Sequence, residues 1–156
     1  MSEKRSKLEE GVELMIEWDK LKKVAGLTEC VVPVVVQDYQ DKEVLMVAYA
    51  NKQALALSLK NREATFWSTS RNELWVKGEK SGNILKLLEV RVNCEQNSLL
   101  YIVKVPDGHS ACHSRDKLGN YRRSCFYRFI PELDTSILIF IDDDELWRLY
   151  EGGEGH

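Results

Sequence analysis

A polar, basic stretch between two cysteines holds the residue types best suited to chemistry. Cys112 is followed directly by His113, and Cys125 closes the stretch. A third cysteine, Cys94, lies upstream in R-V-N-C-E. Soft thiolates together with an imidazole are the ligands that zinc prefers in proteins. These residues therefore predict a zinc site, and the alternative is that they are ordinary buried cysteines.

The spacing of these cysteines does not match a zinc finger. Seventeen residues separate Cys94 from Cys112, and 12 separate Cys112 from Cys125. Ligands so far apart must converge through the fold. The chain has four cysteines, an even number, so disulfides are a second alternative. The fourth, Cys30, stands in C-V-V-P-V-V-V and is expected to be a buried strand thiol.

Guanidinium groups crowd the same stretch and favour a phosphate-binding site beside the zinc. They belong to Arg115, Arg122, Arg123 and Arg128. The alternative is that they are surface arginines paired with acids. The polar segment 70–83 is a second candidate, because it holds Arg71, Lys77 and two glycines. Glycines let backbone amides approach a ligand, although such loops are also ordinary turns.

The composition is that of one soluble domain with a core of its own. The 156 residues are 44% hydrophobic and 30% charged, with a formal net charge of -3. General affinity for nucleic acid is therefore not expected, and an anionic ligand needs a local basic patch. The first residues have no apolar segment typical of a signal peptide, and no apolar run is long enough to span a bilayer. We expect a cytoplasmic protein with reduced cysteines and no membrane partner.

Hydrophobic periodicity predicts both helices and strands. Apolar residues at helical spacing indicate helices at 3–17 and 51–60. Asn51 is a suitable N-cap of the second, and Asn61 a suitable left-handed residue at its end. Asp142 followed by Glu145 predicts a capped third helix, with metal binding by three consecutive aspartates as the alternative. Strands are predicted at 31–37, 44–50, 64–68, 84–93, 99–105 and 137–141.

Three stretches resemble the phosphoribosyl-AMP cyclohydrolase family of histidine biosynthesis. They are E-V-L-M-V-A-Y at 43–49, F-W-S-T-S-R-N-E-L-W-V-K-G-E-K-S-G-N at 66–83, and A-C-H with R-R-S-C-F-Y-R within 111–128. The resemblance implies an α+β, strand-rich single domain over 18–130 with a few helices. It would be flanked by an N-terminal helix at 1–17 and by a C-terminal strand and helix extension at 131–156. It also implies a homodimer.

The resemblance further implies a hydrolase that opens the adenine ring of phosphoribosyl-AMP between N1 and C6. Cys94, Cys112 and Cys125 would be zinc ligands, drawn from both subunits. The zinc would lower the pKa of a bound water towards neutrality. His113 would act as acid and base, or as an additional ligand. The phosphates of the nucleotide would be held by Arg71, Lys77, Arg122 and Arg123.

The sequence departs from the family pattern at two places. The family's D-C-D-x-D, whose aspartates bind magnesium, is here Asn93, Glu95 and Asn97 around Cys94, and these three would share one face of an extended strand. Magnesium is therefore doubtful. The segment 114–121 also replaces a shorter loop of the family. Two other functions stay open: a divergent hydrolase of another heterocycle or C–N bond, and a catalytically silent zinc-binding or nucleotide-binding protein.

Overall fold

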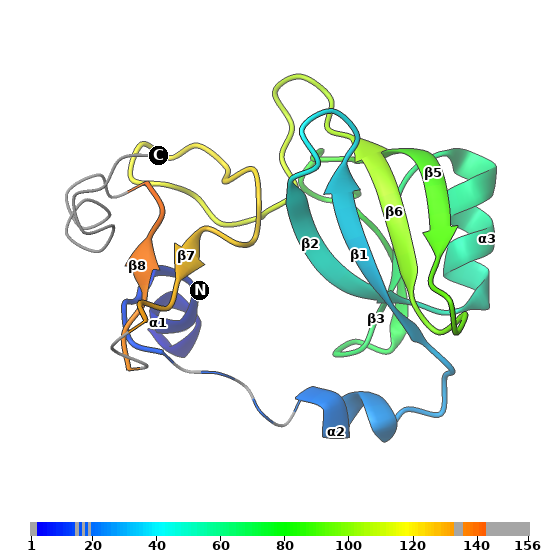
Figure 1. The fold of residues 1–156 in the computed structure, drawn as a ribbon, viewed down its shortest axis with the longest axis horizontal. Coiled ribbons are helices and arrows are strands. Elements are labelled where there is room, and N and C mark those ends of the chain that lie inside the picture. The colour runs from blue at the N-terminus through cyan, green and yellow to red at the C-terminus, as the bar shows by residue number, and fades with distance from the viewer. Residues whose placement is uncertain (1–2, 15, 17, 19, 133–135, 143–156) are drawn as a thin grey trace. The chain divides into compact units, whose positions relative to one another are not determined.

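A computed structural model describes residues 3–14, 16, 18, 20–132 and 136–142 (Figure 1). The chain forms two compact units, residues 19–125 and residues 1–18 together with 126–156. The strand-rich architecture with a few helices confirms the predicted α+β class. Among the described residues, no helix combines the length and the apolar character needed to cross a bilayer.

A four-stranded mixed sheet is the framework of the larger unit, with strand order β2-β1-β6-β5. Its strands are β1 (Val32–Asp38), β2 (Val44–Ala50), β5 (Lys86–Val92) and β6 (Leu99–Lys104). β1 pairs antiparallel with β2 and parallel with β6, and β5 pairs antiparallel with β6. The strands predicted at 31–37 and 44–50 are therefore paired neighbours in the sheet, as are those predicted at 84–93 and 99–105.

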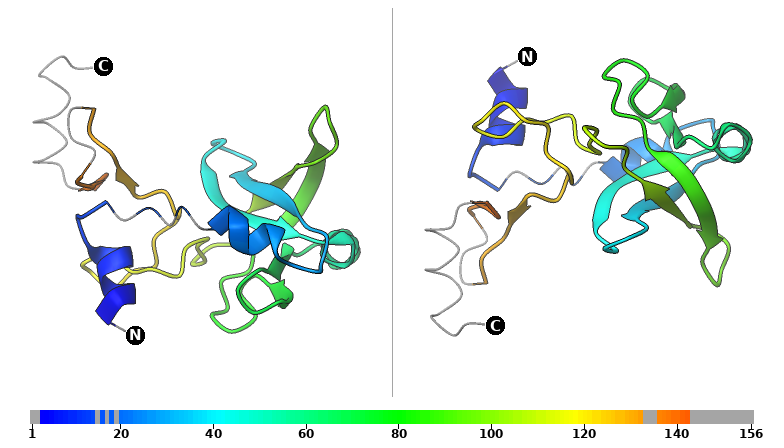
Figure 2. Two further views of the ribbon diagram at one scale, coloured as in Figure 1. Left: turned by 90° about the horizontal axis from the view of Figure 1, so that it is seen from below. Right: turned by 90° about the horizontal axis from the view of Figure 1, so that it is seen from above.

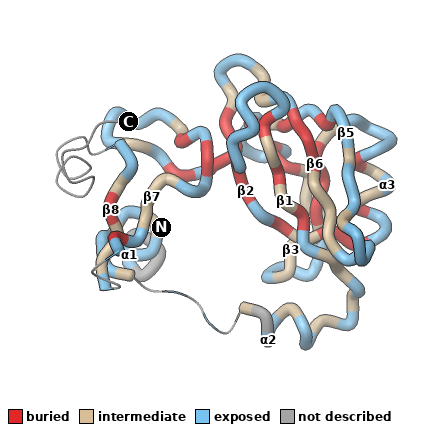
Figure 3. Tube along the Cα trace, in the orientation of Figure 1, coloured by how far each residue is buried: buried red, intermediate tan, exposed pale blue. Residues whose placement is uncertain are grey.

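Alternation along the strands explains which face of the sheet is buried. In β1, Val34 and Val36 have no exposed surface, and in β6 the same holds for Tyr101. Val36 lies beside Met46 of β2 and Tyr101 of β6, so the three strands cover one core. Figure 3 shows buried positions gathered along these strands. Removing apolar area from water is the main force that holds such a sheet together.

Helix α3 (Lys52–Asn61) connects this sheet to a smaller one. As predicted, the side chain of Asn51 caps its N-terminus, accepting from the amide of Ala54 at 2.8 Å. The left-handed residue at its end is Arg62 (φ 56°), one position after the Asn61 predicted for that role. Buried Ser58 joins the helix to the next strand, because its hydroxyl donates to the carbonyl of Thr65 and accepts from its amide.

A two-stranded sheet of β3 (Thr65–Ser68) and β4 (Glu73–Val76) completes the larger unit (Figure 2). β3 was predicted, whereas β4 lies in the segment 70–83 that was expected to be a polar loop. The pairing of Trp75 with Phe66 explains the difference, since Phe66 stacks on Tyr101 in the core with ring centroids 5.6 Å apart. A second unpredicted element is the short helix α2 (Lys20–Ala25).

The smaller unit contains α1 (Glu3–Glu10), β7 (Arg128–Phe129) and β8 (Ile139–Phe140). The helix predicted over 3–17 is therefore shorter. The guanidinium of Arg128 donates to the carbonyls of Leu8 and Gly11, both at 2.8 Å, and so satisfies groups that the helix end leaves open. Arg128 thus has a structural role. The helix predicted from Asp142 and Glu145 lies outside the described residues.

Candidate metal and substrate site

The stretch around the two cysteines folds back on itself and brings Cys112 and Cys125 together. The backbone amide of Ala111 donates to the carbonyl of Arg123 at 3.0 Å, and that of Cys112 to the carbonyl of Arg122 at 3.2 Å. Residues 111–125 are called the cysteine hairpin below. This ladder explains how two cysteines with 12 residues between them become neighbours.

The segment 114–121, which is longer than in the family pattern, forms the outer part of the hairpin. The backbones of Arg115 and Tyr121 form an isolated antiparallel β-bridge. The guanidinium of Arg115 lies 4.0 Å from the centre of the Tyr121 ring. Asp116 closes the tip, because its amide donates to the carbonyl of Asn120 at 2.8 Å and its carboxylate accepts from the amide of Asn120 at 2.9 Å. Gly119 takes the positive φ of 82° that such a tip requires.

The return limb of the hairpin is attached to the edge of the main sheet. The hydroxyl of Ser124 donates to the carbonyl of Val44 at 2.9 Å, and the amide of Cys125 donates to the carbonyl of Leu45 at 2.8 Å. Strand β2 therefore fixes the position of Cys125. Because β2 is an edge strand, its outer backbone groups have no partner in the sheet and are open to this contact.

The thiols of Cys112 and Cys125 form one hydrogen-bonded pair. The hydrogen bond from Cys125, helped by those from Ser114, lowers the pKa of Cys112 to about 5. The same bond raises the pKa of Cys125, so the pair holds one proton between two sulfurs. The hydroxyl of Ser114 lies 3.0 Å from the sulfur of Cys112. All four cysteines of the chain are free thiols.

Two basic side chains lie near this thiol pair. Lys77 is buried at the end of β4, where its ammonium donates to the carbonyl of Asn83 at 3.0 Å. Burial lowers the pKa of Lys77, and the charges of Cys125 and Cys112 oppose that shift. The charge of His113 contributes to the lowered pKa of Cys112. A thiolate beside positive charge is the state in which cysteine binds a metal.

Cys94 is exposed at the turn between β5 and β6. In the part of the chain that the structure describes, no group of three or more His, Cys, Asp or Glu side chains is placed to hold a metal. One chain thus brings together two of the three cysteines predicted as zinc ligands. Cys30, predicted as a buried strand thiol, is exposed, because β1 begins only at Val32.

The side chains at the position of the family's magnesium site bind one another. The chain does not stay extended past the predicted strand, so these three side chains do not share a strand face: residues 94–97 form a turn in which Gln96 has a φ of 55°. The side-chain nitrogen Nδ2 of Asn93 donates to Asn97 Oδ1 at 2.6 Å. Nδ2 of Asn97 donates to Glu95 Oε2 at 3.1 Å. Asn93 Oδ1 accepts from the backbone amides of Asn97 and Ser98. Because these oxygens already accept hydrogen bonds, the set fits a magnesium ion poorly.

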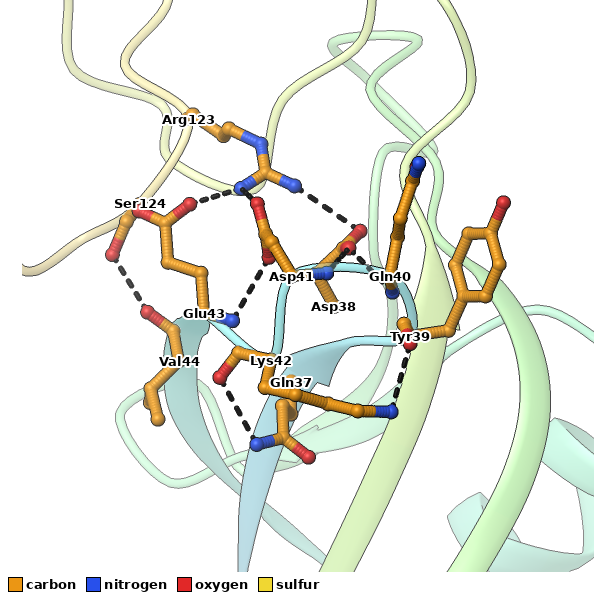
Figure 4. A network of polar contacts seen from close by, with 10 residues as sticks. All are labelled: Gln37, Asp38, Tyr39, Gln40, Asp41, Lys42, Glu43, Val44, Arg123 and Ser124. Atoms are coloured by element: carbon orange, nitrogen blue, oxygen red, sulfur yellow. Dashed lines mark hydrogen bonds and ion pairs between the residues drawn. The ribbon is translucent and has the colours of Figure 1, made fainter.

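The basic residues predicted to bind phosphate are dispersed. Arg71 lies at the turn after β3, half exposed, 3.4 Å from a carboxylate oxygen of Glu73. Arg122 is nearly buried, with its guanidinium 3.5 Å from the hydroxyl of Ser114. The guanidinium of Arg123 is surrounded by the three carboxylates of the β1–β2 turn, shown in Figure 4. Of the three arginines, Arg122 is joined to the thiol pair through Ser114, and Lys77 lies beside the pair as described above.

Sequence reasoning missed two kinds of contact in the site. Ser114 was read only as loop, although a serine two positions after a cysteine can reach its sulfur. No local pattern links the acids of the β1–β2 turn to Arg123, which lies 82 positions after Asp41. The A-C-H-S string would have supported the first contact. The second depends on the tertiary fold alone.

The cysteine hairpin, Cys94 and the basic residues of the site lie within the part of the chain that matches a known family. A model of the phosphoribosyl-AMP cyclohydrolase family matches residues 46–127. A phosphoribosyl-AMP cyclohydrolase of Archaeoglobus fulgidus is 50% identical over 97 residues, which are 62% of this chain and 82% of that protein. One of Methanosarcina barkeri is 46% identical over 134 residues, 86% of this chain and 94% of that protein. The histidine biosynthesis bifunctional protein HisIE of Thermotoga maritima is 47% identical over 96 residues, 62% of this chain and 46% of that protein.

Proposed function

The chain belongs to the phosphoribosyl-AMP cyclohydrolase family, hydrolases that act on a C–N bond of a cyclic amidine, and we propose that it hydrolyses phosphoribosyl-AMP itself. In the proposed reaction, water adds at C6 of the adenine ring, the bond between N1 and C6 breaks, and N1 takes up a proton. The observation that carries this proposal is the thiol pair of Cys112 and Cys125, which lies inside the matched residues with Lys77 beside it.

The thiol pair fits a zinc ion. Its donors are soft, one of them titrates below neutrality, and positive charge lies beside them. Cys112 and Cys125 would hold the zinc, which would supply Lewis-acid activation of water at neutral pH. Such thiols must stay reduced, and we place the protein in the cytoplasm for that reason.

The third zinc ligand in this proposal is Cys94 of a second subunit. Cys94 is exposed at a turn, where a partner chain can reach it, whereas the thiol pair is fixed at the edge of the sheet. A structural or catalytic zinc site uses at least three protein ligands, so two thiols are too few. The active form would then be a homodimer with two sites, each built from both chains.

The residues around the pair have separate roles in the proposed mechanism. His113, next to Cys112 in the chain, is assigned proton transfer, taking a proton as water adds to C6 and returning one to N1. Arg122, linked to Cys112 through Ser114, is assigned to bind one phosphate of the substrate. Arg71, at the turn after β3, is assigned to bind the other phosphate. Lys77 is buried beside the sulfurs and balances their negative charge.

Growth of a histidine auxotroph that lacks its own cyclohydrolase tests the substrate. The chain is expected to restore growth without histidine, and a Cys112→Ser variant is expected not to. A zinc-loaded, well expressed protein that fails to restore growth would favour the second candidate, a divergent hydrolase of another heterocycle. The altered residues Asn93, Glu95 and Asn97 are the observation that keeps this second candidate open.

Magnesium is expected to have little effect on the reaction. With zinc-loaded protein, addition of magnesium should change the rate by less than about twofold, because a hard cation needs charged oxygens and only Glu95 supplies one. Initial rates measured with and without magnesium check this. The matched control is the double variant Asn93→Asp with Asn97→Asp, which should gain magnesium binding by calorimetry. Strict dependence on magnesium that is lost in Glu95→Ala would show that the native turn binds the ion.

A further inference from the structure

A cluster of four charged side chains joins the cysteine hairpin to the β1–β2 turn (Figure 4). Arg123 lies at its centre, with guanidinium nitrogens 3.1 Å from Asp38 Oδ1, 3.0 Å from Asp41 Oδ2, and in contact with Glu43 Oε2. We call these four residues the arginine clamp. Three carboxylates and one guanidinium leave the clamp with a formal charge of -2, which repels a phosphate. Arg123 is thus a poor phosphate ligand.

Two of the three acids of the clamp are held by backbone amides of their own turn. Asp38 is buried, and its Oδ2 accepts from the amides of Gln40 and Asp41 at 2.8 and 3.2 Å, which leaves Oδ1 for Arg123. Asp41 divides its oxygens in the same way, because Oδ1 accepts from the amide of Glu43 and Oδ2 faces Arg123. The hydrogen bond from Glu43 and the charge of Arg123 lower the pKa of Asp41. A rigid, ionised receptor selects one position of the guanidinium.

The residues that follow Arg123 continue the attachment towards the thiol. Ser124 binds the carbonyl of Val44 through its hydroxyl, and Cys125 binds that of Leu45 through its amide. The carbonyl of Arg123 itself accepts from Ala111, on the limb that carries Cys112. Arg123 therefore contacts the β1–β2 turn through its side chain and the limb that carries Cys112 through its backbone carbonyl.

From these contacts we propose that Arg123 is a positioning residue, whose clamp to Asp38, Asp41 and Glu43 sets the separation of the Cys112 and Cys125 thiols. The proposal rests on the proposed zinc site for its consequence in catalysis. The clamp sets the separation of the two sulfurs in the metal-free protein as well. Loss of the clamp should leave the hairpin ladder in place but let the return limb move relative to β2, so that the two sulfurs move apart.

The test compares Arg123→Ala with variants that remove the clamp from its other side. Asp41→Asn combined with Glu43→Gln leaves the hairpin sequence unchanged, leaves Arg123 its contact with Asp38 alone, and should change zinc affinity in the same direction. In both, zinc affinity should fall about 10- to 100-fold, the range typical for loss of a group that supports metal ligands. Combining all three substitutions should add little, because each set breaks the same contact. Arg91→Ala, which removes an exposed ion pair with Glu89 on β5, is the matched control and should leave zinc affinity unchanged.

Thiol chemistry of the metal-free protein separates this proposal from the proposed function. The rate at which a disulfide reagent modifies the thiol pair should rise about tenfold or more in Arg123→Ala and in the turn variant, since a displaced return limb leaves the sulfurs more accessible to the reagent. Arg123→Lys keeps the charge without the planar fork and should restore the native rate only in part. The kinetic pattern should be a lower kcat with KM nearly unchanged.

Unchanged thiol rates and unchanged zinc affinity in both variants would overturn the proposal. A raised KM in Arg123→Ala alone would overturn it too, and would make Arg123 a substrate ligand. Because the thiol rates are measured without zinc and without substrate, they stand even if the chain hydrolyses another heterocycle. If Arg123→Ala fails to fold, Arg123→Lys and the turn variant carry the test.

Discussion

Serine in place of Cys112 is expected to abolish zinc binding and to lower the rate of ring hydrolysis roughly a thousandfold or more, because water would lose the metal that activates it. The sulfur of Cys112 accepts hydrogen bonds that keep it ionised near neutral pH. A serine hydroxyl is far less acidic and stays protonated, so it cannot replace the thiolate as a ligand. Metal analysis of the purified protein and initial rates with the nucleotide measure the two effects.

The chain supplies a matched control for this substitution. Cys30 is exposed, free and outside the cysteine hairpin, so Cys30→Ser should keep full zinc content and full activity. Thermal unfolding of both variants without metal shows whether either change disturbs the fold. A Cys112→Ser protein that retains one zinc per chain would remove the thiol pair from the metal site.

Mixing two inactive variants is expected to restore activity. A Cys94→Ser chain keeps the thiol pair, and a Cys112→Ser chain keeps Cys94, so a dimer of one of each contains one complete site. Random reassortment makes half of the dimers mixed, and each has one of its two sites intact. The mixture should therefore reach about a quarter of the native activity, while each variant alone stays inactive.

In the control for this experiment, both variants lack a cysteine of the thiol pair. Cys112→Ser mixed with Cys125→Ser cannot complete a site, because both positions must come from one chain, where the hairpin ladder holds them together. That mixture should stay inactive. Activity in the second mixture, or none in the first although light scattering shows mixed dimers, would refute a site shared between subunits.

Much of the fold follows from local pattern. The β-branched run of β1, the alternation of β5 and β6, and the cap at Asn51 each carry their own signal, and the structure has them where the sequence predicted them. β4 carried no such signal. Only Leu74, Trp75 and Val76 are apolar among charged neighbours, and they become a strand because Trp75 reaches Phe66 at the core.

The candidate site was predictable in its residue types but not in its contacts. The strings A-C-H and R-R-S-C identify the two cysteines. Their spacing alone cannot show that backbone hydrogen bonds, such as that from Ala111 to Arg123, bring the two thiols together. Two neighbouring arginines look equivalent in sequence. Only the fold separates them, placing Arg122 towards Ser114 and Arg123 on the acidic turn. A run of arginines in the sequence therefore does not show which guanidinium is already paired with acids of the same chain.

Variation in length at the tip of the cysteine hairpin need not move the thiols. Twelve residues, an even number, lie between the two cysteines of this chain. An antiparallel ladder lengthens by one residue on each limb, and an even insertion keeps every side chain on its original face. Because the cost of closing a longer loop grows slowly, residues 117 and 118 are a suitable place to graft a foreign peptide in whole pairs.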